Sequence, residues 1–132
     1  MKRLLIVFSC LMLCASPAMA ISEFGKQWKE KYLGGEDVDE DFKRAGRKAG
    51  CYVCHVKGEK KEVQNEYGIA LKKYLKAKDF PREYVKAKPE EAKKKILEGF
   101  KKAGELESKD GKKFSEKLDK NELHATDSGL LV

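Results

Sequence analysis

Apolar side chains recur every three or four residues along most of the chain, the spacing that gathers them on one face of an α-helix. Phe24, Trp28 and Tyr32 follow this spacing. Ser22 before them is a suitable N-cap, and two glycines follow residue 33. The pattern predicts a first helix over about residues 22–33, with the three aromatic side chains in the core.

Two further helices are indicated in the middle of the chain. Asp39 is a suitable N-cap for a helix over about residues 40–49, and Gly50 ends it. Arg47 and Lys48 lie in its last turn, where the helix dipole favours cations. A longer helix is predicted over residues 62–77, because six apolar residues share one face there: Val63, Tyr67, Ala70, Leu71, Tyr74 and Leu75.

The last third of the chain carries a strong helix start at Pro89, which is followed by two glutamates. This helix is expected to end at Gly104. A short helix is predicted over about residues 111–118, and residues 79–81 are interpreted as a connector. No segment has a convincing strand pattern, so we expect an all-α fold of four or five short helices. From about residue 121 the periodicity is weak, and we expect a loosely ordered tail.

The first twenty residues have the pattern of a secretory signal peptide. Lys2 and Arg3 precede an apolar run over residues 4–13, and small residues lie just before the expected cleavage point after Ala20. The mature chain, residues 21–132, is then expected to form a single domain. No later segment is apolar enough to predict a transmembrane helix.

Cleavage after Ala20 would also remove two of the four cysteines. Cys10 and Cys14 fall in the apolar run and the residues that follow it, and they are interpreted as apolar residues of the leader. The alternative is a lipoprotein cysteine at Cys14, for which the bulky Leu13 before it is a poor context.

Charge is abundant but mixed. The sequence has 132 residues, 41% of them hydrophobic and 39% charged, with 29 basic and 22 acidic residues and a net charge of +7. Removal of the leader takes away two positive charges and lowers the net charge to +5. Arginine is scarce and glutamate frequent, which argues against a nucleic-acid binder and favours a lysine-rich solvated surface.

The segment Cys51-Tyr52-Val53-Cys54-His55 carries the clearest chemical signal in the chain. A CxxCH segment is the attachment motif of a c-type haem. Two thiols at this spacing can each add to a vinyl group on one porphyrin edge, and the following imidazole can bind the iron axially. Because haem is joined to CxxCH outside the bacterial cytoplasm, the leader and the motif support each other.

Three other interpretations of the two cysteines are weaker. A thioredoxin-like redox CxxC usually lies in a βαβ context, which the sequence lacks. A zinc site needs four ligands, so it would have to recruit both His55 and His124. A disulfide between Cys51 and Cys54 would close a very short loop and would leave the role of His55 unexplained.

This motif on a small exported helical chain resembles the cytochrome c family, in particular its small bacterial monohaem members of class I type. The resemblance implies helices packed around one covalently held haem c, with thioether bonds to Cys51 and Cys54 and His55 as the proximal iron ligand. It further implies a periplasmic or otherwise exported electron carrier rather than an enzyme, and peroxidase-like activity is not expected.

The second axial iron ligand departs from the commonest pattern of that family. The three methionines all lie in the leader, so His/Met ligation is excluded for the mature chain. His124 is the candidate distal ligand, although a polar tail histidine exposed to solvent would fit the sequence as well. The alternatives are an open five-coordinate site, a lysine or Tyr67.

The expected function is single-electron transfer between redox proteins. Lysines near the motif could steer a partner with an acidic docking face; they are Lys57, Lys60, Lys61, Lys72 and Lys73. The alternatives are a haem protein that binds or senses a small ligand at an open site and a haem subunit of a larger redox complex. Asn65 and Tyr67 could approach the haem, but a surface asparagine and a core tyrosine are the simpler expectation.

Overall fold

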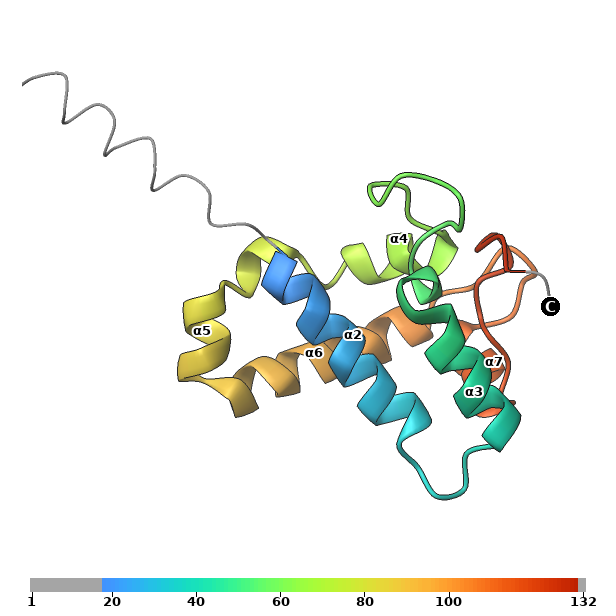
Figure 1. Ribbon diagram of the computed structural model, residues 1–132, viewed down its shortest axis with the longest axis horizontal. Helices are drawn as coiled ribbons and strands as arrows, with labels where there is room; N and C mark the ends of the chain where they lie inside the picture. The colour runs from blue at the N-terminus through green and yellow to red at the C-terminus, as the bar shows by residue number, and fades with distance from the viewer. Residues whose placement is uncertain (1–17, 131–132) are drawn as a thin grey trace, which may run out of the picture.

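Two long helices, α2 (Ala18–Leu33) and α6 (Pro89–Gly104), cross each other in the computed structural model (Figure 1). The structure describes the backbone of residues 18–130 and the side chains of residues 22–130. The other elements in this range are α3 (Glu40–Ala49), the 3₁₀ turn η1 (Gly50–Val53), α4 (Glu66–Lys72), the 3₁₀ turn η2 (Ala77–Asp79), α5 (Arg82–Ala87) and α7 (Phe114–Asp119). No strand occurs among the described residues, so the predicted all-α fold is confirmed.

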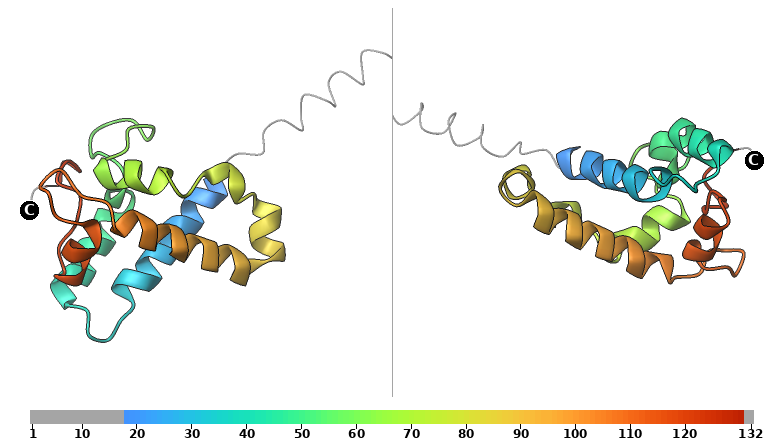
Figure 2. Two further views of the ribbon diagram at one scale, coloured as in Figure 1. Left: turned by 180° about the vertical axis from the view of Figure 1, so that it is seen from behind. Right: turned by 90° about the horizontal axis from the view of Figure 1, so that it is seen from below.

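The helices lie in two layers, with α6 at the centre. Seen from below, α2 and α3 form one layer and α4, α5 and α6 the other, while α7 lies across one end (Figure 2). α6 packs against α2, α4, α5 and α7. In the described part of the chain, no helix combines the length and the apolar character needed to cross a bilayer.

The predicted bounds of α3 and α6 are confirmed, because both helices have local signals at their ends. The Asp39 side chain accepts a hydrogen bond from the Phe42 amide over 2.9 Å and caps α3. Pro89 occupies the first turn of α6, where its missing amide costs nothing, and two glutamates lie at the positive end of the dipole.

The core runs through all the long helices and joins the two layers. Ile96, Phe100 and Ala103 of α6 are fully enclosed, and so is Tyr67 of α4. The other buried apolar residues of this cluster are Trp28, Leu33, Phe42, Ala49, Val53, Ala70, Leu71, Leu75, Phe80, Ala92, Phe114 and Leu118. Trp28 is therefore in the core as predicted, while Phe24 and Tyr32 are partly buried against it.

The predicted helix over residues 62–77 is wrong in length. The structure has a seven-residue helix, α4, that begins after Asn65, because the Asn65 side chain caps it by accepting from the Gly68 amide over 2.9 Å. Its last turn tightens into i→i+3 bonds such as that from the Tyr74 amide to the Leu71 carbonyl. Val63 lies outside the helix, and both Val63 and Tyr74 are exposed.

Other boundaries also differ from the sequence-based expectations. Six α-helices lie within the described residues rather than four or five, because the pattern did not predict α5. α2 begins at Ala18, so its first three residues precede the predicted cleavage point after Ala20, and residues 1–17 of the predicted signal peptide lie outside the described residues. α7 begins at Phe114 rather than near 111, because Gly111 has a φ of 81° and belongs to a turn.

The segment after α7 is packed against the body of the protein, which corrects the expectation of a loosely ordered tail. The Lys57 amide donates to the Ser128 carbonyl over 2.7 Å, and Leu123 and Leu130 pack against the core. These contacts join residues that are far apart in sequence, so periodicity could not predict them.

Candidate functional site

The Cys51–His55 motif forms one tight turn directly after α3. Gly50 has a φ of 54°, which reverses the chain between α3 and η1 and would strain any other residue. Within the turn, the amides of Cys54 and His55 both donate to the Cys51 carbonyl, over 3.2 and 3.1 Å. Cys51 lies in η1 and Cys54 follows η1 as its C-cap, so both cysteines belong to this one turn.

The two cysteines are free thiols with different surroundings. Cys51 is exposed and Cys54 is partly buried. Burial raises the pKa of the Cys54 thiol to about 12, and the neighbouring Cys51 contributes to the same shift. Thiol–disulfide exchange needs an accessible thiolate of low pKa, so the raised pKa of Cys54 argues against a thioredoxin-like centre.

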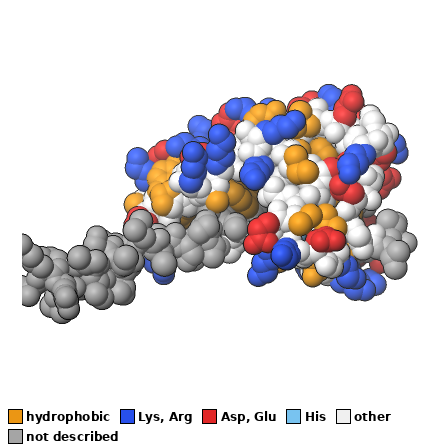
Figure 3. Space-filling model, turned by 90° about the horizontal axis from the view of Figure 1, so that it is seen from above, with side chains coloured by type: hydrophobic (Ala, Val, Ile, Leu, Met, Phe, Trp, Pro, Cys, Tyr) orange, Lys and Arg blue, Asp and Glu red, His pale blue; other side chains and the backbone are white. Residues whose placement is uncertain are grey.

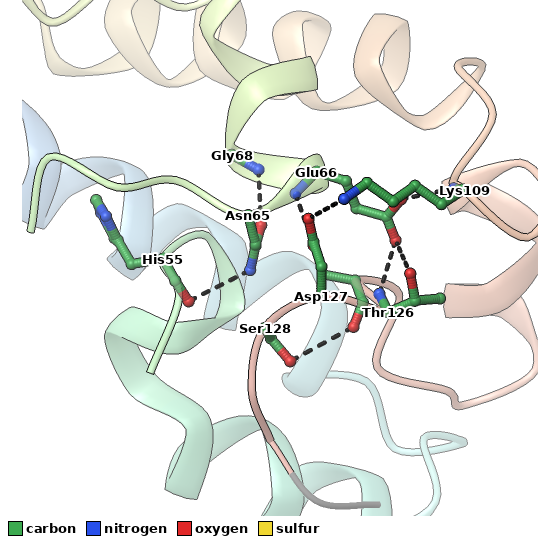
Figure 4. Close-up of polar contacts among 9 residues, drawn as sticks. His55, Asn65, Glu66, Gly68, Lys109, Thr126, Asp127 and Ser128 are labelled. Atoms are coloured by element: carbon green, nitrogen blue, oxygen red, sulfur yellow. Dashed lines mark hydrogen bonds and ion pairs between the residues drawn. The ribbon is translucent and has the colours of Figure 1, made fainter. Parts of the chain in front are cut away.

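His55 has an imidazole that is not committed to another contact. The residue is half-buried, and its ring Nδ1 is enclosed without a hydrogen-bond partner among the described residues. Figure 4 shows the ring pointing away from Asn65, while the backbone carbonyl of His55 points toward it. The side chain is therefore held by its backbone and is free to act as a ligand.

Asn65 lies inside the loop that the motif forms. It is 0% exposed, so the expectation of a surface asparagine is wrong. Its side-chain Nδ2 faces the carbonyls of Tyr52, Val53 and His55, at 3.1, 3.0 and 3.5 Å. Its backbone amide donates to the carbonyl of Cys54 over 2.9 Å. The sequence signal for this role was an Asn directly before an acidic first turn, which is typical of an N-cap.

The first turn of α4 is also tied to the C-terminal segment through carboxylate contacts, most of them partly buried (Figure 4). The Glu66 side chain accepts from the backbone amides of Lys109 and Thr126, over 2.6 Å in each case. The Glu66 amide donates to the Asp127 side chain over 2.9 Å, and Asp127 also pairs with the Lys109 ammonium at 2.7 Å. These contacts hold three separate segments in one arrangement beside the motif. No local pattern in the sequence predicts these contacts.

His124 is buried, which corrects the alternative of an exposed tail histidine. It is 1% exposed, and neither ring nitrogen has a hydrogen-bond partner among the described residues. Its ring centroid lies 3.7 Å from that of Tyr67 and 5.8 Å from those of Trp28 and Phe114. Burial, and then the nearby Lys117 charge, lower the pKa of His124 to about 3, so its imidazole is neutral near pH 7.

Tyr67 links the surroundings of His124 with those of the motif. It is fully buried, and the prediction of a core tyrosine is confirmed. Burial raises the pKa of the Tyr67 hydroxyl well above its ordinary value, and Tyr32 and Cys54 raise it further, which places the Cys54 thiol near this ring. Trp28 Nε1 is also enclosed without a partner among the described residues.

Within residues 22–130, no three His, Cys, Asp or Glu side chains converge into a group that could hold a metal ion by themselves. Cys51, Cys54, His55 and His124 therefore do not form the four-ligand group that the zinc interpretation requires. A hollow of about 470 Å³ lies beside Tyr32 and Phe100, and one of about 320 Å³ lies beside α4 and residues 106–109. Neither hollow is lined by the motif.

The lysines near the motif are all exposed. Lys57, Lys60 and Lys61 lie on the loop that follows the motif, and Lys72 and Lys73 lie at the end of α4. In the face shown in Figure 3, basic side chains are interspersed with acidic and apolar ones rather than gathered into one uniform patch.

Comparison of the chain with protein-family models, with curated proteins and with solved structures found no match.

Proposed function

We propose that the mature chain carries one haem c, joined by thioether bonds to Cys51 and Cys54 with His55 as proximal iron ligand, and that it transfers single electrons between redox proteins outside the cytoplasm. One observation carries the proposal: one thiol lies in a 3₁₀ turn, the second lies at the end of that turn, and an imidazole follows directly. The predicted signal peptide is consistent with the compartment in which such haem is attached.

The chemistry of the donor set fits this group. The bound haem would supply one-electron chemistry through its ferric and ferrous states. Cys51 and Cys54 would anchor the porphyrin, and His55 has an uncommitted imidazole. Because Cys54 is partly buried, its thiol has to become accessible before a thioether bond can form there.

His124 is our proposed distal ligand. Leaving both nitrogens of a buried imidazole unpaired costs free energy, so such a group calls for an explanation, and ligation of a metal is one. Its neutral form is the form that binds iron. Bis-histidine ligation would give a lower reduction potential than His/Met ligation.

Intact-mass measurement tests the proposal. The full-length chain is produced in a bacterial host with c-type haem attachment machinery, and the exported product is weighed. We expect the mass of residues 21–132 plus one haem, and no covalently held haem in the Cys51→Ala/Cys54→Ala variant. An exported wild-type chain without added tetrapyrrole would overturn the proposal.

A further inference from the structure

The Asn65 side chain can lie in only one orientation. Its Oδ1 accepts from the Gly68 amide at 2.9 Å, while Nδ2 faces the carbonyls of Tyr52 and Val53. Turning the amide over would set an oxygen against carbonyl oxygens and an NH₂ group against an N–H. The amide oxygen therefore faces a hydrogen-bond donor, and the amide nitrogen faces acceptors. Neither Asp nor Leu could make both sets of hydrogen bonds.

The motif backbone is wrapped around this one residue. Four successive carbonyls, from residue 52 to residue 55, have Asn65 as a hydrogen-bond donor, three through Nδ2 and the carbonyl of Cys54 through the backbone amide. An amide NH₂ has two protons, so the strong bonds are those of 3.0 and 3.1 Å, and the His55 carbonyl at 3.5 Å is a weak third. Together they fix the peptide planes on both sides of Cys54, and hence the directions of the Cys54 and His55 side chains.

Gly68 allows α4 to come close enough for these bonds. A Cβ atom at Gly68 would lie 2.2 Å from the carbonyl oxygen of Cys54, which is a backbone atom that cannot move aside by itself. Asn65 and Gly68 thus act together: one supplies the hydrogen bonds, and the other removes the side chain that would keep α4 away from the motif.

We propose that Asn65 is a positioning residue of the haem motif, which sets the orientation of His55 by holding the carbonyls of residues 52–55. The inference rests on the proposed function. It adds that Asn65 helps to set the ligand field and the reduction potential of the iron. Residues that orient a metal ligand through its hydrogen bonds typically affect metal affinity or activity by about 10–100-fold.

Asn65→Asp is the decisive variant. It keeps the oxygen that caps α4 but replaces the NH₂ donor with an oxygen that faces the carbonyls of Tyr52 and Val53. Asp39→Ala is the matched control, because it removes the N-cap of α3 without a contact to the motif carbonyls. Both variants are made in the full-length exported protein and compared with wild type by intact mass, electron paramagnetic resonance and reduction potential.

We expect Asn65→Asp to change the ferric resonance spectrum and the potential, and to lower the yield of haem-attached chain by about tenfold. Asp39→Ala should lower stability but leave spectrum and potential as in wild type. If Asn65→Asp yields no haem-bearing chain, Asn65→Gln provides a second measurement, because it keeps the amide but displaces it by one methylene, and it should shift the spectrum.

The failures of the two proposals are distinguishable. A wild-type protein without covalent haem overturns the proposed function, and the positioning role falls with it. A haem-bearing wild type whose spectrum and potential are shared by Asn65→Asp, or by Asn65→Gln where Asn65→Asp carries no haem, overturns the positioning role alone. A change of the same size in Asp39→Ala also overturns it, because loss of a helix cap would then be sufficient.

Discussion

His55 and His124 are the two histidines of this chain, and their surroundings give them different parts in the proposed site. His55 follows the paired thiols and is oriented by its own backbone. His124 comes from the distant C-terminal segment and is enclosed by the rings of Trp28, Tyr67 and Phe114. His124 is a candidate ligand because its side chain is buried and lacks a polar partner. His55 is a candidate ligand because it directly follows the paired thiols.

Replacing His124 tests the second ligand directly. We expect the haem-bearing His124→Ala protein to lose low-spin absorption and to bind carbon monoxide in the ferrous form, because one coordination position becomes open. Phe114→Leu is the control, since it changes a ring that packs against His124 but has no atom that could bind iron. A His124→Ala spectrum identical to that of wild type would exclude ligation by His124, and carbon monoxide binding to wild type would favour the open-site alternative.

The carboxyl of Asp110 is expected to make the free energy of unfolding depend on pH. Hydrogen bonds from the Lys117 ammonium, the Ser108 hydroxyl and the Lys112 amide hold the pKa of its carboxyl below the usual range. A carboxyl with a lowered native pKa stabilises the fold above its unfolded pKa, about 3.9, and this contribution is lost as the pH falls through the native value.

The measurement is urea unfolding of wild type and Asp110→Asn at pH 7 and at pH 3. We expect Asp110→Asn to lower the free energy of unfolding at pH 7 and the difference to shrink at pH 3. Asp37→Asn, at an exposed position between α2 and α3, serves as the control. An equal difference at both pH values would show that the charge of Asp110 is not responsible.

α4 shows at the scale of elements how tertiary contacts override local pattern. Seven residues are too few to form a stable helix in isolation, so its packing and its hydrogen bonds to distant segments hold it in place. The helix begins four residues later than the apolar pattern predicts, because the hydrogen bond from the Gly68 amide to the Asn65 side chain sets its start. By contrast, α3 and α6 were predictable because their ends depend on neighbours in sequence.

Two glycine substitutions separate helix propensity from packing. Gly25→Ala in α2, where an added Cβ meets nothing within 4 Å, should raise the free energy of unfolding by about 0.5–1 kcal/mol. Gly68→Ala in α4 should lower it by about 1–3 kcal/mol, because the Cβ would overlap the Cys54 carbonyl. Urea unfolding measures both, and a stabilised Gly68→Ala would contradict the close contact between α4 and the motif.

In the whole molecule, the motif lies at the surface directly after the end of α3. Exposed lysines lie on the loop that follows the motif. The net positive charge and these side chains predict attraction of anionic redox partners at low ionic strength. Since basic and acidic groups are mixed over the face in Figure 3, the effect should be local to the motif rather than general.

Electron transfer with small reagents tests this. Oxidation of the ferrous protein by ferricyanide should slow as salt is added, because screening removes the attraction. The triple variant Lys57→Gln/Lys60→Gln/Lys61→Gln should be slower and less sensitive to salt. A control triple variant lies away from the motif, at Lys26, Lys78 and Lys86 of α2, η2 and α5. Equal effects of the two triple variants would exclude a docking role for the loop.

By itself, the sequence determined the helical class, the extents of α3 and α6 and the candidate haem residues, because caps, apolar spacing and the CxxCH motif each depend on residues that are close in the chain. Three features depend on how the folded chain packs: Asn65 fills the motif loop, Gly68 contacts Cys54, and His124 is buried beside Tyr67. Such contacts join groups that are 10 to about 60 residues apart in the sequence. Examples are the hydrogen bond between Asn65 and His55 and the one between Glu66 and Thr126. The burial and pairing of a side chain are set by the segments packed around it, and local periodicity carries no information about them.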